Sequence, residues 1–394
     1  MSPNMSSLQE TVPVGPPRER RAAAVAHVDR VPSARKAPKT VQANGAPVRS
    51  PAPAAGNQHE PVGEFLSHDE YSQWDQFVDK SPHGTVFHYS WWLEAASSQF
   101  KLLAVRDEKG RIVAGLPLPL RRRAGLRLLH SPALTPYLGP IFDISGADNT
   151  CDQLHLMRKY GEALGNHIGT YDSLRYVAGA LAPDLQGLIW AGFRVGLSSY
   201  TFRFPAGLSS EDVRSAMTRT HLQKLDKALS MNVSIARDGD INELIALNAK
   251  TFERQNLAVP YDLDLVRRLW AAASAHGNAR LYVVKAKDGT PVSALFTVND
   301  HKTTYQIVSG VDTTIKNVPG AYLTLWHAIQ DALAAGRAFD FEGSGIRGVE
   351  TFYRRWGAMP WPVWRIEKCN SWRGALLQFV LERRHQVSRS QSRS

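Results

Sequence analysis

Cysteine is scarce in this sequence, and the residue patterns of several enzyme classes are missing. The 394 residues contain two cysteines, Cys151 and Cys369, which are too few for a disulfide framework or a thiolate zinc site. The thirteen histidines show no metal-ligand spacing. No Gly-x-Ser-x-Gly or Walker sequence occurs either. We therefore expect no metal centre, and hydrolase and nucleotide triphosphatase functions have no support.

Long apolar runs are also lacking. No stretch approaches the ~18 uninterrupted apolar residues of a membrane-spanning helix. Near the N-terminus, no apolar core follows the basic residues as it would in a signal peptide. The sequence therefore predicts a cytoplasmic protein without a transmembrane segment.

The net charge of +11 is concentrated near the two ends of the sequence. Residues 1–62 carry +4 and residues 383–394 carry +4, which leaves +3 for the residues between them. Residues 1–62 also hold 10 of the 23 prolines and little aliphatic periodicity, so we expect both tails to be disordered. The composition fits two alternatives. The tails are solvated and have no partner, or the basic tails make peripheral contact with an anionic membrane or with RNA.

An internal repeat is the most informative feature of the remaining sequence. With a shift of 179 residues, residues 101–116 (KLLAVRDEKGRIVAGL) align with residues 280–295 (RLYVVKAKDGTPVSAL). Each copy has an apolar segment, a polar turn ending in Gly110 or Gly289, and a second apolar segment. This pattern is typical of a β-hairpin. The same shift pairs Trp91 with Trp270 in a helix-like segment before each hairpin.

The repeat continues beyond the hairpins with a shift of 169 residues. It aligns two segments with apolar residues at helical spacing, in which Leu154 and Leu164 match Leu323 and Leu333. A short apolar segment follows each helix, at residues 174–177 and 338–341. Two aligned blocks in the same order favour duplication over chance. The sequence thus predicts an α/β fold of two duplicated lobes, with mixed, largely antiparallel sheets flanked by helices.

Three segments carry a resemblance to a known family. Residues 339–358 (FDFEGSGIRGVETFYRRWGA) combine an acidic, Gly-Ser-containing strand end with an aromatic-Tyr-Arg helix and then Gly-Ala. Residues 217–228 (MTRTHLQKLDKA) form a basic helix-like segment, and residues 137–140 (YLGP) an aromatic-Gly-Pro turn. Together they resemble the Fem-type, FemAB-like branch of the GNAT acyltransferase superfamily. The resemblance implies GNAT-like lobes at residues 63–195 and 196–368, between a disordered tail (1–62) and a C-terminal helix with a basic tail (369–394).

The resemblance also implies an activity. Such proteins move an activated acyl group, acetyl or aminoacyl, to an amine, so we expect an amine acceptor that is a small molecule or is linked to a sugar in a cell-envelope or polysaccharide precursor. The expected donor is acyl-CoA or aminoacyl-tRNA, which makes tRNA a candidate partner; no permanently bound cofactor is expected. A noncatalytic lobe pair that binds an anionic ligand or a protein is the alternative.

Three residues of the C-terminal motif are candidates for catalysis. Glu342 and Ser344 follow an apolar segment and could orient the acceptor amine, although Glu-Gly-Ser is also common as a simple turn. Either the Tyr353 hydroxyl or the neighbouring Arg354 is expected to face the cleft, while the aromatic residues Phe352 and Trp356 pack in the core. Arg354 is a candidate for substrate binding.

Further binding residues come from the other motifs. Tyr137 and Gly139 of the first lobe, and Arg219 and Lys224 of the basic helix, are candidates for substrate binding; a solvated basic face explains the last two equally well. The segment before the helix at residues 322–335 retains part of a phosphate-binding loop, although its first glycine is missing. A plain helix-entry turn with Pro319 is the alternative. The candidate donor-binding residues of this segment are Lys316, Gly320 and Ala321.

One dense basic cluster lies within the first lobe. It consists of four arginines among leucines: Arg121, Arg122, Arg123 and Arg127. Attraction of a phosphorylated or nucleic-acid substrate explains the cluster, and so does a hairpin edge kept soluble by charge.

Overall fold

The computed structural model describes residues 60–380, except 232, 255–256, 316–317 and 344–346. Most of the two tails expected at 1–62 and 369–394 therefore lies outside the described residues. Residues 372–380 are helical. Among the described residues, no helix is long and apolar enough to cross a membrane, and no group of His, Cys, Asp and Glu side chains is arranged to hold a metal ion.

The two hairpins expected from the repeat are present and share their irregularities. The first consists of β2 (Phe100–Arg106) and β3 (Ile112–Pro119), and the second of β10 (Ala279–Lys285) and β11 (Pro291–Asn299). The pairing register shifts at aligned positions, after Val105 in one hairpin and after Val284 in the other. Both turns close on a glycine in the left-handed region, with φ 75° at Gly110 and 84° at Gly289. Shared irregularities of this kind support the duplication.

The helices and strands around the hairpins also recur. Before the hairpins come α2 (Ser90–Ala96) and α8 (Leu263–Ala275), and after them α3 (Thr150–His167) and α9 (Gly320–Ala334). Each of the later helices leads to a strand, β7 (Ser173–Ala178) or β13 (Ala338–Asp340). The α/β fold class with duplicated lobes is thus confirmed, and the strand expected at 338–341 ends one residue early.

The sheets are less symmetric than the repeat. A four-stranded sheet has the order β1-β2-β3-β6, whereas a ten-stranded sheet has the order β4-β5-β7-β14-β8-β13-β12-β11-β10-β9. The first hairpin therefore lies in the small sheet and the second in the large one. The strands not yet given are β1 (Gly63–Phe65), β4 (Arg121–Arg123), β5 (Leu126–His130), β6 (Ile141–Phe142), β8 (Arg194–Phe204), β9 (Ser234–Ala236), β12 (Thr303–Val311) and β14 (Met359–Cys369).

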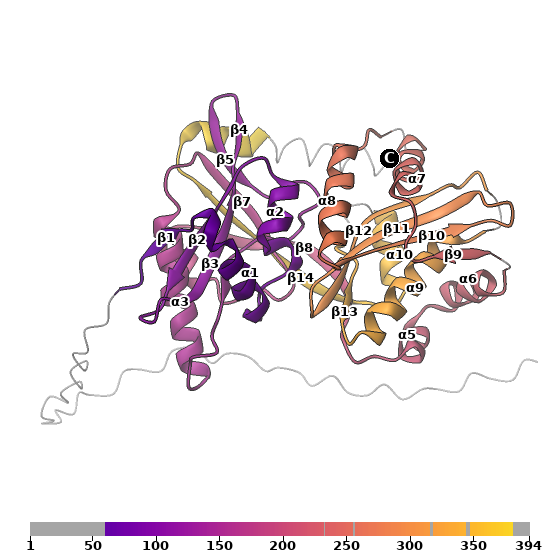
Figure 1. Ribbon diagram of the computed structural model, residues 1–394, viewed down its shortest axis with the longest axis horizontal. Helices are drawn as coiled ribbons and strands as arrows, with labels where there is room; N and C mark the ends of the chain where they lie inside the picture. The colour runs from indigo at the N-terminus through magenta and orange to yellow at the C-terminus, as the bar shows by residue number, and fades with distance from the viewer. Residues whose placement is uncertain (1–59, 232, 255–256, 316–317, 344–346, 381–394) are drawn as a thin grey trace, which may run out of the picture. The chain divides into compact units, whose positions relative to one another are not determined.

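Two long strands join the lobes within the large sheet. β14 pairs with β8 from Met359 to Glu367, and the end of β14 also pairs with β7 of the first lobe. The other end of β8 pairs with β13 of the second lobe, where Phe204 lies opposite Phe339 (Figure 1). The division of the chain into lobes at residue 195 remains a proposal.

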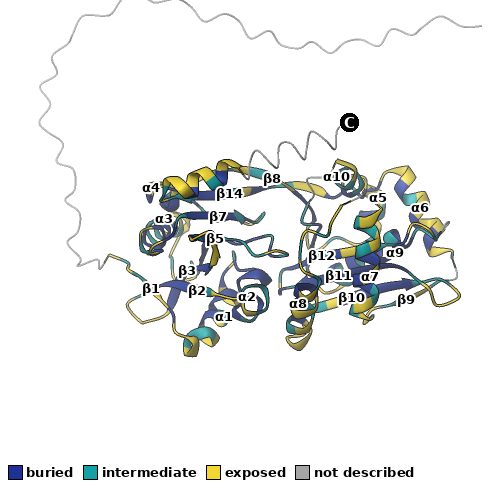
Figure 2. Cartoon of the chain, turned by 90° about the horizontal axis from the view of Figure 1, so that it is seen from above, coloured by how far each residue is buried: buried dark blue, intermediate teal, exposed yellow. Residues whose placement is uncertain are grey.

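The second lobe has a helix layer on each face of its sheet. Alternate residues of β10 enter different cores: Leu281 and Val283 join the core that includes α7 (Ile241–Glu253) and α8, whereas Tyr282 and Val284 join the core that includes α9. This alternation follows from the two-residue period of a strand. The outer sides of α8 and α6 are exposed (Figure 2). The remaining helices are α1 (Tyr71–Lys80), α4 (Gln186–Trp190), α5 (Ser210–Ala216), α6 (Arg219–Leu229) and α10 (Arg347–Arg354).

Candidate active site

The pairing of two parallel strands stops where the candidate site begins. β12 and β13 pair through three positions, the last of which is Tyr305 opposite Asp340. β12 continues to Val311, but the segment after β13 turns away from it. There Phe341 donates its backbone N–H to the carbonyl of Phe202 on β8, at 3.0 Å. Beyond Tyr305, the edge of β12 therefore has main-chain groups that β13 does not pair. Such groups can hold an acyl group in place.

Glu342 lies at this point in an unusual backbone conformation. Its φ of 58° lies in the left-handed region, which non-glycine residues seldom adopt. Its backbone N–H donates to Oδ1 of Asp340 at 2.7 Å. The next residue must be glycine, because a Cβ atom on Gly343 would lie 2.3 Å from the carbonyl oxygen of Tyr200. The Glu-Gly sequence is therefore required by a tight turn, and the turn places the Glu342 side chain beside the strand ends.

The Glu342 carboxyl group is desolvated. The residue is half-buried, but its Oε1 atom is shielded from solvent and has no hydrogen-bond donor among the described residues. Burial, and then the nearby charge of Asp340, raises the pKa of this carboxyl well above its usual value. A carboxyl group with a raised pKa binds a proton readily, as a general base must.

Tyr353 and Gln306 lie beside Glu342. Nε2 of Gln306 on β12 donates to the hydroxyl oxygen of Tyr353 on α10 at 2.8 Å, while Oε1 of Gln306 is buried without a donor among the described residues. Burial raises the pKa of Tyr353; the hydrogen bond from Gln306 opposes this rise, and the Glu342 charge adds to it. The Tyr353 hydroxyl therefore stays protonated and its own proton is available to an acceptor. The structure thus brings two of the expected catalytic residues, Glu342 and Tyr353, together.

Asp340 connects this group to the first lobe. Its carboxylate accepts hydrogen bonds from the hydroxyls of Thr201 and Tyr137, and Nε of Arg203 lies 3.3 Å from its Oδ2. Asp340 and Arg203 are 1% and 6% exposed, so the ion pair is buried. Burial raises the pKa of Asp340, although the Arg203 charge opposes this rise. Nη2 of Arg203 also donates to Thr303 at 3.0 Å.

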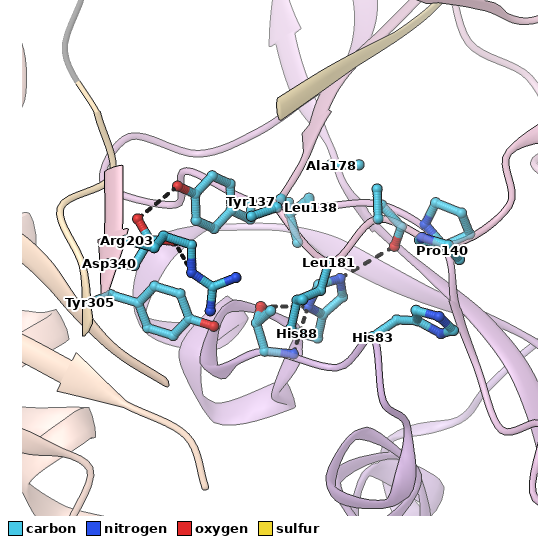
Figure 3. Close-up of a pocket in the computed structure, with 16 residues that line it drawn as sticks. His83, His88, Tyr137, Leu138, Pro140, Ala178, Leu181, Arg203, Tyr305 and Asp340 are labelled. Atoms are coloured by element: carbon cyan, nitrogen blue, oxygen red, sulfur yellow. Dashed lines mark hydrogen bonds and ion pairs between the residues drawn. The ribbon is translucent and has the colours of Figure 1, made fainter. Parts of the chain in front are cut away.

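A pocket extends from Asp340 into the first lobe (Figure 3). Tyr137, Arg203 and Asp340 lie at one end, and His83 and Pro140 at the other. The turn expected at residues 137–140 therefore lines the pocket.

His88 is hydrogen-bonded to this turn. Its Nε2 lies 3.3 Å from the carbonyl oxygen of Gly139, and its Nδ1 lies 2.8 Å from the hydroxyl of Thr85. Burial lowers the pKa of His88 to about 3, so the ring is neutral. Nε2 then donates to Gly139 and Nδ1 accepts from Thr85. Burial also lowers the pKa of His83 to about 4.

A loop of the second lobe holds the segment that carries these histidines. Oδ2 of Asp300 accepts the backbone N–H of Val86 at 3.1 Å, and Nζ of Lys302 donates to the carbonyl of Ser81 at 2.8 Å. Asp300 is 2% exposed. The residues that line the pocket thus come from both lobes, and hydrogen bonds connect the two lobes at this place.

A second group of expected residues lies apart, at the start of α9. Lys224 and Lys227 of α6 line a shallow hollow with Val318, Pro319 and Tyr322. Nζ of Lys224 lies 5.9 Å above the Tyr322 ring. Gly320 and Ala321 form the first turn of α9, where the helix dipole favours an anion. The backbone N–H of Gly320 already donates to the carbonyl of Val318 at 2.9 Å, and that of Tyr322 donates to the carbonyl of Pro319 at 3.0 Å. Gly320 also has a packing role, because a Cβ atom there would lie 2.8 Å from Cβ of Ser293.

Of the other residues expected to bind or react with substrate, those that the structure describes do not line either of these two hollows. Arg219 is exposed at the start of α6, and Arg354 is exposed and forms a salt bridge with Glu350 at 2.6 Å. Lys316 and Ser344 lie outside the described residues. In the basic cluster, Arg121, Arg122 and Arg123 form the exposed strand β4, and Arg127 lies on β5.

Several residues of the site were missed by the sequence analysis. Asp340 is the one polar residue of β13, and a polar residue among buried neighbours is a usable signal of a functional or structural polar group. Gln306 and Arg203 lie in strands that contain several other polar residues, so they carry no such signal. His88 lies among aromatic residues and carries no motif. Only the fold shows that these four residues, far apart in sequence, belong to one region.

Comparison with known proteins agrees with the geometry. Residues 213–354 match the acetyltransferase (GNAT) domain family. This segment contains the second hairpin, α9, the strand ends and the helix that carries Tyr353. Among curated proteins, no sequence matches the chain significantly.

Solved structures show the same fold over most of the chain. The crystal structure of FemX is similar with a TM-score of 0.60 and 14% identity, over 77% of this chain and 96% of that chain. A conserved protein of unknown function from Bacteroides thetaiotaomicron VPI-5482 is similar with a TM-score of 0.50 and 12% identity, over 78% and 99%. The Fem-type resemblance is thereby confirmed at the level of the fold: the chain has a fold similar to that of FemX, and residues 213–354 match an acetyltransferase (GNAT) domain, which supports acyl transfer.

Proposed function

We propose that the protein transfers an acetyl or aminoacyl group to the amine of a cell-envelope or polysaccharide precursor. The observation that carries this proposal is the buried Oε1 atom of Glu342, which lacks a donor among the described residues where the pairing of β12 and β13 ends. A buried polar atom without a partner costs about 1–3 kcal/mol. Such a cost is expected at a site that receives its partner from a substrate.

The class of partner follows from the atoms that lack one. Oε1 of Glu342 and Oε1 of Gln306 are both hydrogen-bond acceptors, and neither has a donor among the described residues. An amine supplies two or three N–H donors in a small volume. An amine acceptor is therefore the ligand that best satisfies this part of the site.

The proposed chemistry uses these groups in order. Glu342 orients the amine and takes its proton directly or through water, and the amine nitrogen attacks the acyl carbonyl carbon. Main-chain groups of β12 beyond Tyr305 stabilise the oxyanion. As the new C–N bond forms, the C–S or C–O bond to the donor breaks, and the leaving group takes a proton from the Tyr353 hydroxyl. Glu342 then returns its proton to Tyr353.

The donor is proposed to be acyl-CoA or aminoacyl-tRNA. Both carry phosphates, and the hollow at the start of α9 offers Lys224, Lys227 and the N-terminal turn of α9. Ala321 and Gly320 belong to this turn. These donors are made in the cytoplasm, which we propose as the compartment of the reaction.

The acceptor is proposed to bind in the pocket that leads from Asp340 to Pro140. The pocket offers aromatic rings at Tyr137 and Tyr305 and polar groups at Arg203 and His83. The pocket has a volume of about 30 Å³ and these rings are almost fully buried, so only a small group of the acceptor enters it, where it contacts the rings and the polar groups. Tyr137 and Gly139 then bind the substrate, as expected from the sequence.

A ligand panel followed by a turnover assay tests the function. Purified protein is heated with acyl-CoAs, aminoacyl-tRNAs and UDP-sugars, and a true ligand raises the unfolding temperature because it binds only the native state. Donors that stabilise the protein are then offered amine acceptors, with product measured by mass spectrometry. Binding without any acyl transfer would favour the noncatalytic alternative. Stabilisation by no member of the panel would contradict the proposed donor classes.

A further inference from the structure

The C-terminal helix at residues 372–380 turns apolar side chains outward. Trp372 is 76% exposed and Leu376 is 54% exposed, whereas the polar Gln378 is 5% exposed. The spacing of four residues places Trp372 and Leu376 on one side of the helix. Leaving apolar side chains outside and a glutamine inside is the reverse of what a helix of a water-facing surface requires.

The helix is held in this orientation by its inner side. The Ser371 hydroxyl donates to Oδ1 of Asp172 at 2.6 Å, and Cys369 donates its S–H to Oε1 of Gln378 at 2.7 Å. Gly374 packs so closely that a Cβ atom there would lie 2.3 Å from the carbonyl oxygen of Asp172. A rotation that buried Trp372 would break these contacts, so its exposure follows from the packing.

A row of arginines borders the exposed apolar side chains. Nη2 of Arg373 donates to the carbonyl of Ala124 at 3.1 Å, which joins the helix to the turn between β4 and β5. The strand β4 on this hairpin consists of three exposed residues, Arg121–Arg123. Figure 1 shows the helix beside β4, and Figure 2 shows its exposed outer side next to α4 and β14.

The charge of this surface is predominantly positive. Within the part of the chain that the structure describes, Arg121, Arg122, Arg123 and Arg373 form no ion pair. The sequence after residue 380 adds four more arginines (Arg383, Arg384, Arg389 and Arg393) and one acidic residue, Glu382. Two nearby carboxylates are already engaged: Asp172 accepts the Ser371 hydroxyl and the backbone N–H of Arg127, and Glu367 lies among three arginines.

We propose that Trp372, Leu376, Arg373 and the β4 arginines form a surface that docks on a bilayer containing anionic phospholipids. Tryptophan prefers the interfacial region of a bilayer, where its ring is apolar and its N–H remains hydrated. Arginines beside it gain about 1 kcal/mol each from the negative surface potential. A combination of apolar insertion and basic charge is what stable peripheral binding requires. This basic aromatic surface is independent of the proposed acyl transfer.

The charge pattern favours a membrane over a second protein. The rim of a protein interface is polar and complementary to its partner, and the centre is poor in charge. Here a row of arginines that form no ion pair among the described residues adjoins the exposed tryptophan, and the sequence places four further arginines beyond the helix. A uniformly anionic plane complements this arrangement along its whole length.

Vesicle co-sedimentation of the full chain tests the proposal. Wild-type protein is mixed with vesicles of phosphatidylcholine alone and with vesicles that also contain phosphatidylglycerol, at low and high salt. We expect binding to the second kind only, weakened by salt. The triple substitution Arg121→Ser, Arg122→Ser and Arg123→Ser should weaken binding on the order of 100-fold at low salt, from about 1 kcal/mol per arginine. Trp372→Ser with Leu376→Ser should weaken binding about 10-fold or more.

Matched controls separate this surface from general charge or apolarity. The first control removes the same number of positive charges from exposed positions of the second lobe, with Arg254→Ser, Arg267→Ser and Arg268→Ser. The second control, Leu154→Ser, removes a leucine of α3 that is 48% exposed. Both control proteins should bind like wild type. Equal loss in the controls, or equal binding to both kinds of vesicle, would overturn the proposal. Self-association that depends on Trp372, without vesicle binding, would overturn it in favour of a second copy of the chain.

Discussion

The hydroxyl of Tyr137 donates a hydrogen bond to Oδ1 of Asp340, 3.3 Å away and 203 residues later in the chain. Tyr137 belongs to the turn at the pocket, and Asp340 ends the strand before Glu342. The same carboxylate also accepts from Thr201 and from the Glu342 backbone, and it faces Arg203. One buried carboxylate thus sets the position of the first-lobe turn relative to the candidate catalytic residue.

Arg203→Leu should destabilise the protein, because it leaves the buried Asp340 charge without its partner. Breaking a buried pair in this way typically costs about 3–5 kcal/mol. Loss of Arg203 raises the pKa of Asp340 further above its unfolded value, so protonation relieves the variant. The difference in unfolding free energy from wild type should therefore shrink as pH falls through the raised pKa of Asp340. Urea unfolding at several pH values measures it.

The double variant Arg203→Leu, Asp340→Asn is the control for this ion pair. It removes both charges and should recover part of the lost stability. A double variant less stable than Arg203→Leu by the full cost of a second substitution would show that the two side chains act independently.

Glu342→Gln should lower kcat by about 100-fold or more while the fold is retained, because the amide keeps the shape and cannot accept the amine proton. In wild type, kcat should fall at acid pH as Glu342 becomes protonated near its raised pKa. The variant should lack this acid limb. A pH profile of acyl transfer measures both effects, with Glu350→Gln as the matched control, because the Glu350 side chain is 31% exposed and pairs with Arg354 on α10.

Two other outcomes of that profile are informative. A uniform loss with the acid limb retained assigns Glu342 to positioning of the amine, with the proton leaving to solvent. Equal rates for wild type and Glu342→Gln at every pH would remove Glu342 from the mechanism.

Tyr353→Phe should lower kcat by removing the proton donor to the leaving group, with little change in KM for the acceptor. It also leaves Nε2 of Gln306 without its acceptor, so a loss of about 1–3 kcal/mol in unfolding free energy is expected. Tyr261→Phe is the control, because the Tyr261 hydroxyl bonds to Asn248 at 3.2 Å, in another part of the lobe. A fall in kcat for the control as large as for Tyr353→Phe would assign the effect to stability.

Lys224→Ala should weaken donor binding about 10-fold and reduce its dependence on salt, because one cation is lost from the hollow at α9. Stability should change by about 1 kcal/mol or less, as is usual for an exposed charge. Isothermal titration with the donor found in the ligand panel measures the affinity. Arg219→Ala, at the exposed start of the same helix, tests whether the effect is specific to the hollow; unchanged affinity for Lys224→Ala would return α6 to a solvated basic face.

His88→Gln should make the protein less sensitive to acid. The folded pKa of about 3 lies below the unfolded value of about 6.5, so neutral His88 contributes stability above pH ~6.5 that is lost as pH falls toward 3. Between these values one such group gives a slope of about 1.4 kcal/mol per pH unit. Unfolding free energies at pH 4 to 7 should show a shallower slope for His88→Gln, and the wild-type slope for the exposed His301→Gln. Identical slopes for both variants would contradict the neutral buried ring.

Much of the fold could be predicted from local patterns. The hairpin periodicity, the turn glycines at 110 and 289, and the helical spacing before 338 all arise from short-range rules that act within one segment. The motif at 339–358 likewise indicated Glu342 and Tyr353. The joining of ten strands into one sheet could not be predicted, because β8 pairs with β13 and β14 over long sequence distances. No pattern within a strand specifies which distant strand will lie beside it.

The sequence by itself indicated the duplication, the resemblance to the Fem-type branch and two of the candidate catalytic residues, because each of these is written in contiguous residues. Only the tertiary structure decided which polar groups share a site. Tyr137, Arg203, Gln306 and Asp340 come from different elements, and their burial together depends on how β8, β12 and β13 pair. It also decided that Trp372 faces outward, because the contacts of Gln378 and Gly374 orient the helix. Desolvation and hydrogen bonding between distant residues exist only once the chain has folded.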